Sequence, residues 1–514
     1  VMCIYPQSTK NNLSTWTARR AAIEACERLG TIHDSIPGHL SERHGLMPLA
    51  EALYQLHCPD DPDTGDRARD RLAWDELMHR QLVLATMRAQ RESEPASQST
   101  EHGLADQWIA SLPYPLTGDQ QRCVDEIRAD MAAKLPMSRV LQGDVGMGKT
   151  LPSIVAMLDA VASGHQAVLL APTEVLARQH YREIAEVTEQ MGLTCAFVSG
   201  KAYDVTPQRE AKSKAAYNRS IRAGLADGSI QIAVGTHALF SKAVSFDDLG
   251  LVVIDEQHRF GVEQRAKLVE AQGRTPDLLM ASATPISRTV LAVAFGDMPV
   301  SFLREYPAGR GERMSHWIDR ADADRPDNPV WQQVRHEVAS GRQAFVVVPM
   351  VESEIAMAAS AQATTDALSA GALSGLRVGV ATGKTDPDEM RATMAAMAAG
   401  ELDVLVATTV IEVGVNVPNA TVMVVLDADH FGISQLHQLR GRVGRGKHPG
   451  TFWLVCDPYV PDKSTGELKL GNPKTAERLQ LVATCDDGFA LAEADFAARG
   501  AGSLTGSKQS GNSS

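Results

Sequence analysis

A loop in the first third of the sequence has the residues to hold phosphate. Residues 143–150, GDVGMGKT, have the spacing GxxxxGK[ST] and follow a short β-branched run. In such a loop glycines let backbone amides curl around phosphate oxygens, the lysine reaches the β and γ phosphates, and the hydroxyl holds magnesium. A glycine-rich turn that binds nothing is the alternative, but the position between a strand and a helix argues against it. We therefore predict nucleotide contacts from Gly143, Asp144, Gly146, Gly148, Lys149 and Thr150.

Two neighbouring carboxylates stand at the end of another apolar run. Residues 251–254 lead directly into Asp255 and Glu256. The carboxyl ends of buried parallel strands are where such sheets build their sites. Asp255 is predicted to orient magnesium, and Glu256 to position and deprotonate the water that attacks the γ-phosphate. A solvated turn is the alternative for these residues taken alone.

An arginine-rich segment lies further along the chain. Residues 435–445 read QLHQLRGRVGR, and the glycines would weaken a plain surface helix, which is the alternative. We expect a turn in which Arg445 acts as an arginine finger, with Arg442 beside it and Gln438 at the γ-phosphate. Since loop and finger then belong to different domains, ATP would bind between them, and its hydrolysis would open and close the cleft.

The elements that position these residues are predicted to form two successive α/β units. Short β-branched runs between helical stretches are typical of buried parallel strands. The runs of the first unit are 139–141, 167–170, 230–234, 251–254 and 278–281. Those of the second unit are 344–348, 378–380, 404–407, 422–426 and 452–455, with a crossover helix expected at 357–375. Before residue 91 leucines recur at helical spacing, and the polar stretch 92–100 is expected to be a linker.

The composition is that of a soluble globular chain. Its 514 residues include 50 Lys and Arg against 63 Asp and Glu, a net charge of −13, and no apolar run is long enough for a membrane helix. The acidic balance argues weakly against nucleic acid, but four cations without a carboxylate can form a local site. They are Arg440, Arg442, Arg445 and Lys447. The seven cysteines lack metal-ligand spacing, so we expect reduced thiols and no structural zinc.

These motifs resemble those of superfamily 2 nucleic-acid helicases and, more closely, of the RecG family of branch-migration helicases. The resemblance covers almost the whole chain, and Gln120 matches the family's adenine-reading motif. Segments such as 171–174 with Gln179 and His180, 235–239, 282–286 and 407–415 resemble its nucleic-acid contact and coupling motifs. The residues implied to contact DNA or couple it to hydrolysis are Thr173, Thr236, His237, His258, Ser282, Thr284, Thr408, Thr409, Arg499 and Gln509.

Two regions distinguish this family from other superfamily members. The helical N-terminus, including 56–59 and 71–74, resembles the segment that links the family's wedge domain to its motor. Residues 487–511 resemble the hairpin and loop that convert cleft closure into duplex translocation. The second feature is shared with the transcription-repair coupling translocase and the first is not, so the first decides between the two families.

The resemblance implies an α/β fold with two tandem RecA-like domains. We expect a helical linker region at 1–100 with the end of the wedge at 1–12, RecA-like domains at 101–300 and 301–465, and a partial translocation hairpin and loop at 466–514. The implied activity is ATP- and Mg²⁺-dependent translocation on duplex DNA, which remodels forks and four-way junctions in recombination and repair. The alternatives are a truncated motor that binds ATP and DNA without productive unwinding, and a translocase of the transcription-repair coupling type. The implied partners are branched DNA and a single-stranded DNA-binding protein, for a monomer at the bacterial nucleoid in the cytoplasm, with no membrane.

The sequence also departs from the family pattern. Most of the wedge, which splits strands at a junction, is expected to be missing, and the C-terminus to be truncated after residues 509–511. Met147, Ser287, Thr382 and Asn416 replace residues that are usual in the family. Because Lys149, Asp255, Glu256 and Arg445 are all retained, we expect ATP hydrolysis to survive.

Overall fold

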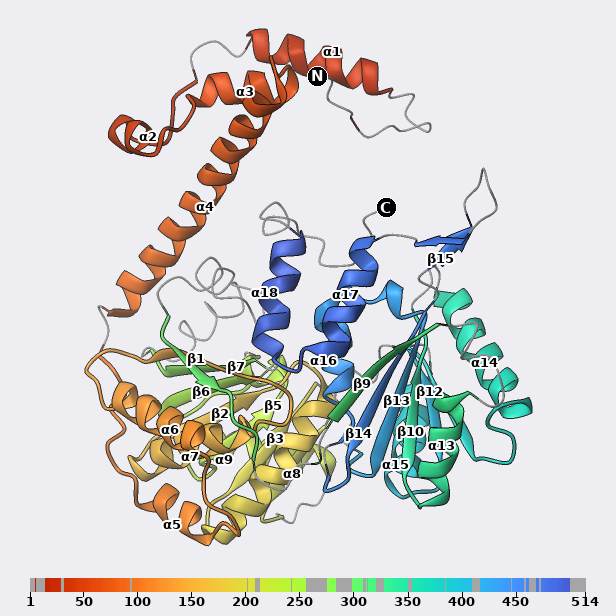
Figure 1. Ribbon diagram of the computed structural model, residues 1–514. Helices are drawn as coiled ribbons and strands as arrows, with labels where there is room; N and C mark the ends of the chain where they lie inside the picture. Colours follow the sequence, from red (N-terminus) through yellow and green to blue (C-terminus); the bar gives the residue numbers. More distant parts are fainter. Residues whose placement is uncertain are drawn as a thin grey trace. The chain divides into compact units, whose positions relative to one another are not determined.

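The structure, a computed structural model, divides into two compact units (Figure 1). The first holds Val1–Gln90, Thr289–Asp297 and Arg499–Ser514, and the second holds Arg91–Arg288 and Met298–Ala498. The residues that the structure describes are 5, 14–28, 32–92, 95–200, 202–208, 213–241, 243–255, 275–282, 298–307, 311, 313–319, 328–349, 354–383, 385–408, 417–444, 446–456, 459–461, 468–470 and 473–499.

The first unit is helical, as the leucine spacing predicts. Its helices are α1 (Thr15–Arg28), α2 (Gly38–His44), α3 (Leu49–His57) and the long α4 (Pro62–Glu92). The buried guanidinium of Arg71 on α4 donates to Asp34, at 2.5 Å, and to Asp75. A buried charge of this kind is stable only when it is paired, so Arg71 ties α4 to the turn before α2.

The polar stretch predicted at 92–100 begins with the last residue of α4, and its residues 95–100 form no regular element. It is nevertheless packed, because Ser97 and Ser99 are buried. The backbone amide of Ser99 donates to the carbonyl of Met131 at 2.9 Å, and that of Ala96 donates to the carbonyl of Lys134. These bonds hold the stretch against the end of the helix that precedes the first sheet.

The first sheet has eight strands in the order β4-β3-β5-β2-β6-β7-β1-β8, parallel except for the β3–β4 pair. All five strands predicted for this unit are present, and β3, β4 and β8 are additional. The elements are α5 (Gly103–Ser111), α6 (Gly118–Met131), β1 (Ser138–Gly143), α7 (Thr150–Ala162), β2 (Gln166–Leu170), α8 (Glu174–Gln190), β3 (Cys195–Val198), β4 (Tyr203–Thr206), α9 (Lys214–Ala226), β5 (Ile232–Gly235), η1 (His237–Phe240), β6 (Leu249–Asp255), β7 (Asp277–Ser282) and β8 (Val300–Leu303). Helices α6, α7 and α8 pack on one face of this sheet through a buried apolar core.

The second sheet has six parallel strands in the order β11-β12-β10-β13-β14-β9. The five predicted strands and the crossover helix are confirmed. The elements are β9 (Arg313–Ile318), α13 (Pro329–Ala339), β10 (Gln343–Val347), α14 (Glu354–Ala370), β11 (Val378–Ala381), α15 (Pro387–Ala398), β12 (Val404–Ala407), β13 (Ala420–Leu426), η4 (Ala428–His430), α16 (Ile433–Arg440), β14 (Gly450–Val455), the hairpin β15 (Tyr459–Pro461) and β16 (Leu468–Leu470), α17 (Pro473–Thr484) and α18 (Gly488–Arg499).

Both faces of the second sheet are buried, which explains its continuous apolar runs. Successive side chains of a strand point to opposite faces, so Phe345 and Val347 join the core with α16 and α17, while Ala344 and Val346 join the core with α13 and α14. Figure 1 shows α13 and α14 beside this sheet. Among the described helices, none is long and apolar enough to span a membrane.

Asp277 is a buried carboxyl at the start of β7, away from the strand ends that form sites. Its Oδ1 accepts the amide of Met137 at 2.6 Å, while its Oδ2 has no hydrogen-bond partner among the described residues. Burial, with a smaller contribution from the charge of Asp130, raises the pKa of Asp277 to about 8. The folded chain therefore keeps this group protonated at a pH where the unfolded chain ionises it.

We predict that Asp277→Asn changes how thermal stability depends on pH. The pKa of Asp277 is higher in the folded chain than in the unfolded chain. The stability that the protonated group contributes is therefore fully present below about pH 4 and is lost as the pH rises toward about 8. From pH 4 to pH 8 the variant should therefore gain roughly 4–6 kcal/mol on the parent, because a pKa difference of one corresponds to about 1.4 kcal/mol. Thermal unfolding at a series of pH values measures this difference, and an unchanged profile would contradict it. Asp403→Asn is the control of opposite sign, since a hydrogen bond from Arg377 lowers the pKa of Asp403.

Candidate active site

The predicted phosphate loop connects β1 to α7. Gly146 and Gly148 have φ values of 84° and 77°, a region that side chains with a Cβ rarely adopt, and α7 begins at Thr150. The Nζ of Lys149 donates to the carbonyls of Gly143, at 2.8 Å, and Asp144, at 3.0 Å. The ammonium group is thus folded over the loop, whose backbone leads into a helix N-terminus suited to phosphate.

Three strands that end in predicted site residues bring those residues to one edge of the first sheet. Strands β6, β7 and β1 are parallel neighbours, and Asp255, Ser282 and Gly143 are their last residues. In register, Asp255 pairs with Ala281 and Gln142 pairs with Ser282. The sheet therefore brings the predicted magnesium ligand, the coupling serine and the phosphate loop to the same edge.

Asp255 has a partner that the sequence did not suggest. Its Oδ2 lies 2.8 Å from the Nε2 of His180 on α8, and both side chains are mostly buried. His180 lies in a segment that was expected to contact nucleic acid. A histidine that donates to a carboxylate restricts the carboxylate's orientation, so this contact limits how the side chain of Asp255 can point.

Gln120 braces the phosphate loop from α6. Its Oε1 accepts the amide of Thr117 at 3.1 Å, in a capping box, and its Nε2 donates to the carbonyl of Met147 at 3.3 Å. A Cβ added to Gly148 would lie 2.5 Å from that Nε2. Met147, a departure from the family pattern, is buried in the loop, where its Sδ lies 3.1 Å from the amide nitrogen of Asp144. The loop thus accommodates the larger side chain.

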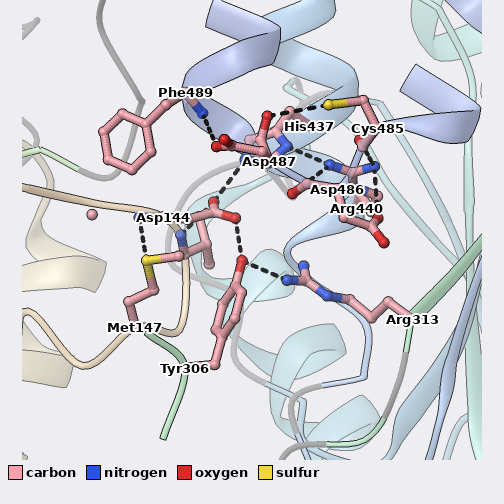
Figure 2. Close-up of polar contacts among 12 residues, drawn as sticks. Asp144, Met147, Tyr306, Arg313, His437, Arg440, Cys485, Asp486, Asp487 and Phe489 are labelled. Carbon is pink, nitrogen blue, oxygen red and sulfur yellow. Dashed lines mark hydrogen bonds and ion pairs between the residues drawn. The ribbon is translucent and has the colours of Figure 1, made fainter. Parts of the chain in front are cut away.

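The side chain of Asp144 connects the loop to the second sheet, as Figure 2 shows. It is 1% exposed, and its Oδ1 lies 2.8 Å from the Nε2 of His437 on α16. Its Oδ2 accepts from the hydroxyl of Tyr306, which in turn accepts from Arg313 of β9 at 2.7 Å. Burial acts to raise the pKa of Asp144, but the bonds from His437 and Tyr306 and the charge of Arg313 hold that pKa well below its usual range.

Arg440 faces the protein interior, although it was expected in a local cationic site. It is 1% exposed, and burial lowers its pKa. Its Nη2 lies 2.8 Å from the Nδ1 of His437, while its Nη1 donates to the carbonyls of Val482 and Cys485 at 3.0 and 2.8 Å. Arg440 therefore satisfies carbonyls at the end of α17, which leaves Arg442, Arg445 and Lys447 as the candidate cations for phosphate.

The arginine-rich segment packs directly against the phosphate loop. A Cβ on Gly441 would lie 2.8 Å from the Cβ of Val145, so only glycine fits at this position. Gln438 and Arg442 lie on either side of Gly441 and are partly buried. Their segment is the one that meets the loop at Val145, where the sequence analysis predicts nucleotide contacts.

The second sheet's C-terminal helices also reach the first sheet. Phe489 of α18 forms an edge-to-face pair with Phe302 of β8, with ring centroids 5.6 Å apart. The guanidinium of Arg304 lies 5.6 Å from the ring centroid of Phe302 and 5.4 Å from that of Phe489. Such aromatic and cation–π contacts favour a defined docking of α18 on the strand beside β1.

The predicted DNA-contacting residues occupy strand and helix ends. Thr173 caps α8, where its hydroxyl accepts the amide of Leu176 at 3.4 Å. Thr236 follows β5, Ser282 ends β7 and Thr408 follows β12, and these three are buried, whereas His237 is exposed. Several predicted site residues lie outside the described part of the chain: Glu256, His258, Thr284, Thr409, Arg445 and Gln509, and the side chain of Arg499.

Comparisons with known proteins agree with this geometry. The DEAD/DEAH box helicase family pattern matches residues 117–293, and the helicase conserved C-terminal domain pattern matches residues 329–447. The ATP-dependent DNA helicase RecG of Mycobacterium tuberculosis (strain ATCC 25618 / H37Rv) is 40% identical over 529 residues, which cover 99% of this chain and 69% of that protein. RecG of Escherichia coli O157:H7 is 40% identical over 524 residues, 99% of this chain and 71% of that protein.

A solved structure of RecG bound to a three-way DNA junction has the same fold. It superimposes with a TM-score of 0.75 at 34% sequence identity, over 96% of this chain. The superposition covers 62% of the RecG chain, so this chain spans less than two thirds of that relative's length.

We predict that Gly148→Ala weakens ATP turnover. The added Cβ would strain a left-handed backbone and displace Gln120 from Met147, which should lower kcat/KM for ATP at least about tenfold. Gly164→Ala is the matched control, because Gly164 has a φ of 89° but open space around its Cβ. Steady-state kinetics should show near-parental turnover in the control, and equal losses in both variants would refute a specific role for Gly148.

Proposed function

Because this chain belongs to the RecG family of ATP-dependent DNA helicases, we propose that it moves along duplex DNA and remodels forks and four-way junctions. The observation that carries the proposal is the docking of the arginine-rich segment of the second sheet on the phosphate loop of the first, through Asp144 and His437. A nucleotide bound in that loop would lie between two sheets that can close on it. The relative described as bound to a three-way junction supports branched DNA as the substrate.

The nucleotide site would use residues from both sheets. Lys149 and the loop amides would bind the β and γ phosphates, and Gln120 would support the loop beside the base. Glu256 would position and deprotonate the attacking water, while Gln438, Arg442 and Arg445 would stabilise the γ-phosphate from the second sheet.

The site also has the donors that magnesium prefers. Thr150 at the start of α7 and Asp255 at the end of β6 supply hard oxygen ligands, and the contact from His180 orients the carboxylate of Asp255. Bound there, the ion would neutralise charge that develops on the phosphates. Thr150 and Asp255 would hold it, and the chain's own groups would bind the phosphates and move the proton of the water.

DNA contacts would come mainly from strand ends that face the same side as the nucleotide. The proposed residues are Thr173, Thr236, His237, His258, Ser282, Thr284, Thr408, Thr409, Arg499 and Gln509. Because such contacts are mostly to phosphates, binding should be insensitive to sequence and sensitive to salt. We also propose the domain limits expected from the sequence, a monomer at the nucleoid, and a single-stranded DNA-binding protein as a partner.

We predict that duplex DNA stimulates the ATPase of the parent chain and that a branched fork stimulates it more. Lys149→Ala removes the charge at the phosphates and should lower kcat by roughly 100-fold or more. Lys134→Ala is the matched control, since Lys134 is exposed and lies before β1, at the strand end away from the loop. Steady-state ATPase assays without DNA, with linear duplex and with a fork measure both effects.

These assays separate the possible outcomes. Stimulation in the parent and the Lys134→Ala control, but not in Lys149→Ala, would support a DNA-dependent motor. Hydrolysis that DNA never stimulates would argue against the motor and leave a chain that binds nucleotide without translocation. Equal stimulation by linear and forked DNA would refute the preference for branches.

A further inference from the structure

A continuous row of hydrogen bonds crosses from the second sheet to the phosphate loop. It runs from Arg440 to His437, then to Asp144, Tyr306 and Arg313 (Figure 2). Two arginines end the row, and a carboxylate 1% exposed lies at its centre. Each link of the row is made by a protein group.

The row requires one ring tautomer of His437. A guanidinium only donates hydrogen bonds, so the Nδ1 of His437, 2.8 Å from Arg440, must accept and carries no proton. The ring hydrogen is then on Nε2, which donates to the carboxylate of Asp144 at 2.8 Å. Arg440 thereby fixes which nitrogen of His437 faces the phosphate loop, a role like that of the group that orients a catalytic histidine.

Asp144 connects the ring of His437 to the backbone of the phosphate loop. Its Oδ1 also accepts the amide of Val145 at 2.6 Å, and its own carbonyl accepts from Lys149 at 3.0 Å. The carboxylate that His437 holds is therefore part of the same residue on which the phosphate-binding lysine rests. A shift of α16 would move Asp144, and with it the first turn of the loop.

We propose that His437, as the Nε2–H tautomer set by Arg440, is a positioning residue for ATP hydrolysis, which links the placement of α16 to the shape of the phosphate loop through Asp144. This inference rests on the proposed function, because it concerns the same nucleotide site. It assigns a specific task to a histidine whose two ring nitrogens contact Asp144 and Arg440.

The test compares two replacements of His437 in the full chain. His437→Phe fills the space without hydrogen bonds, whereas His437→Gln can accept from Arg440 and donate to Asp144. Loss of a charge-assisted buried bond should lower DNA-stimulated kcat about 10- to 100-fold in His437→Phe, and His437→Gln should recover most of it. His336→Phe on α13 is the control for the same exchange at an exposed histidine.

A double-mutant cycle then tests the link itself. Asp144→Ala and His437→Phe act on one bond, so the double variant should lose no more activity than the worse single variant. Thermal unfolding and binding of a fluorescent ADP analogue identify variants that simply fail to fold. A His437→Phe chain with parental kcat, a His437→Gln chain as poor as His437→Phe, or losses that multiply in the double variant would each overturn the inference.

The same experiment keeps the two claims apart. If DNA stimulates the parent and His437→Phe equally, the motor stands and only the role of His437 is wrong. If DNA stimulates no chain, the proposed function fails and the inference that rests on it fails too.

Discussion

The buried carboxylate of Asp144 is the constraint on which the arrangement of the two sheets depends. An ionised carboxylate without water is stable only when hydrogen-bond donors surround it. Here the donors to the carboxylate come from three places in the sequence: the amide of Val145 in the loop itself, His437 on α16 of the second sheet, and the hydroxyl of Tyr306 after β8, which in turn accepts from Arg313 of β9. Because no single element supplies enough donors, the charge is satisfied only when both sheets contribute.

This arrangement explains how one fold can respond to a nucleotide. The carboxyl ends of β1, β6 and β7 bring the phosphate loop, the proposed metal ligand Asp255 and the proposed coupling residue Ser282 to a single edge. The segment 438–442 of the second sheet meets that edge at Val145. Packed interfaces of this kind change between discrete states rather than gradually. A small shift at the phosphate loop can therefore be passed on to α16, α17 and, through Phe489, α18.

Sequence patterns predicted much of the fold because buried parallel strands appear in the sequence as short, continuous runs of apolar residues. All ten predicted strands are present, and the phosphate loop lies where its glycine spacing placed it. The strands that were not predicted are short or polar: β4 reads YDVT and β9 reads RMSHWI, and both lie at a sheet edge, where one side of the strand has no neighbour.

The site was harder to predict, because its partners are distant in sequence. The contacts His180–Asp255 and His437–Asp144 join residues 75 and 293 positions apart, and no local spacing encodes them. Tyr306 and Arg313 lie outside every motif. Arg440 was expected in a cationic site, but in the structure its side chain is buried and contacts the end of α17. Charge and spacing indicate which groups could react, whereas their pairing depends on the tertiary structure.

Movement along duplex DNA is the central claim, and displacement of a third strand from a triplex tests it most directly. The account predicts that the chain releases the third strand from linear duplex only while it hydrolyses ATP, and not with a non-hydrolysable analogue or in Lys149→Ala. Release that needs no hydrolysis, or vigorous DNA-stimulated hydrolysis without any release, would contradict the account, since the motor would then turn over without moving.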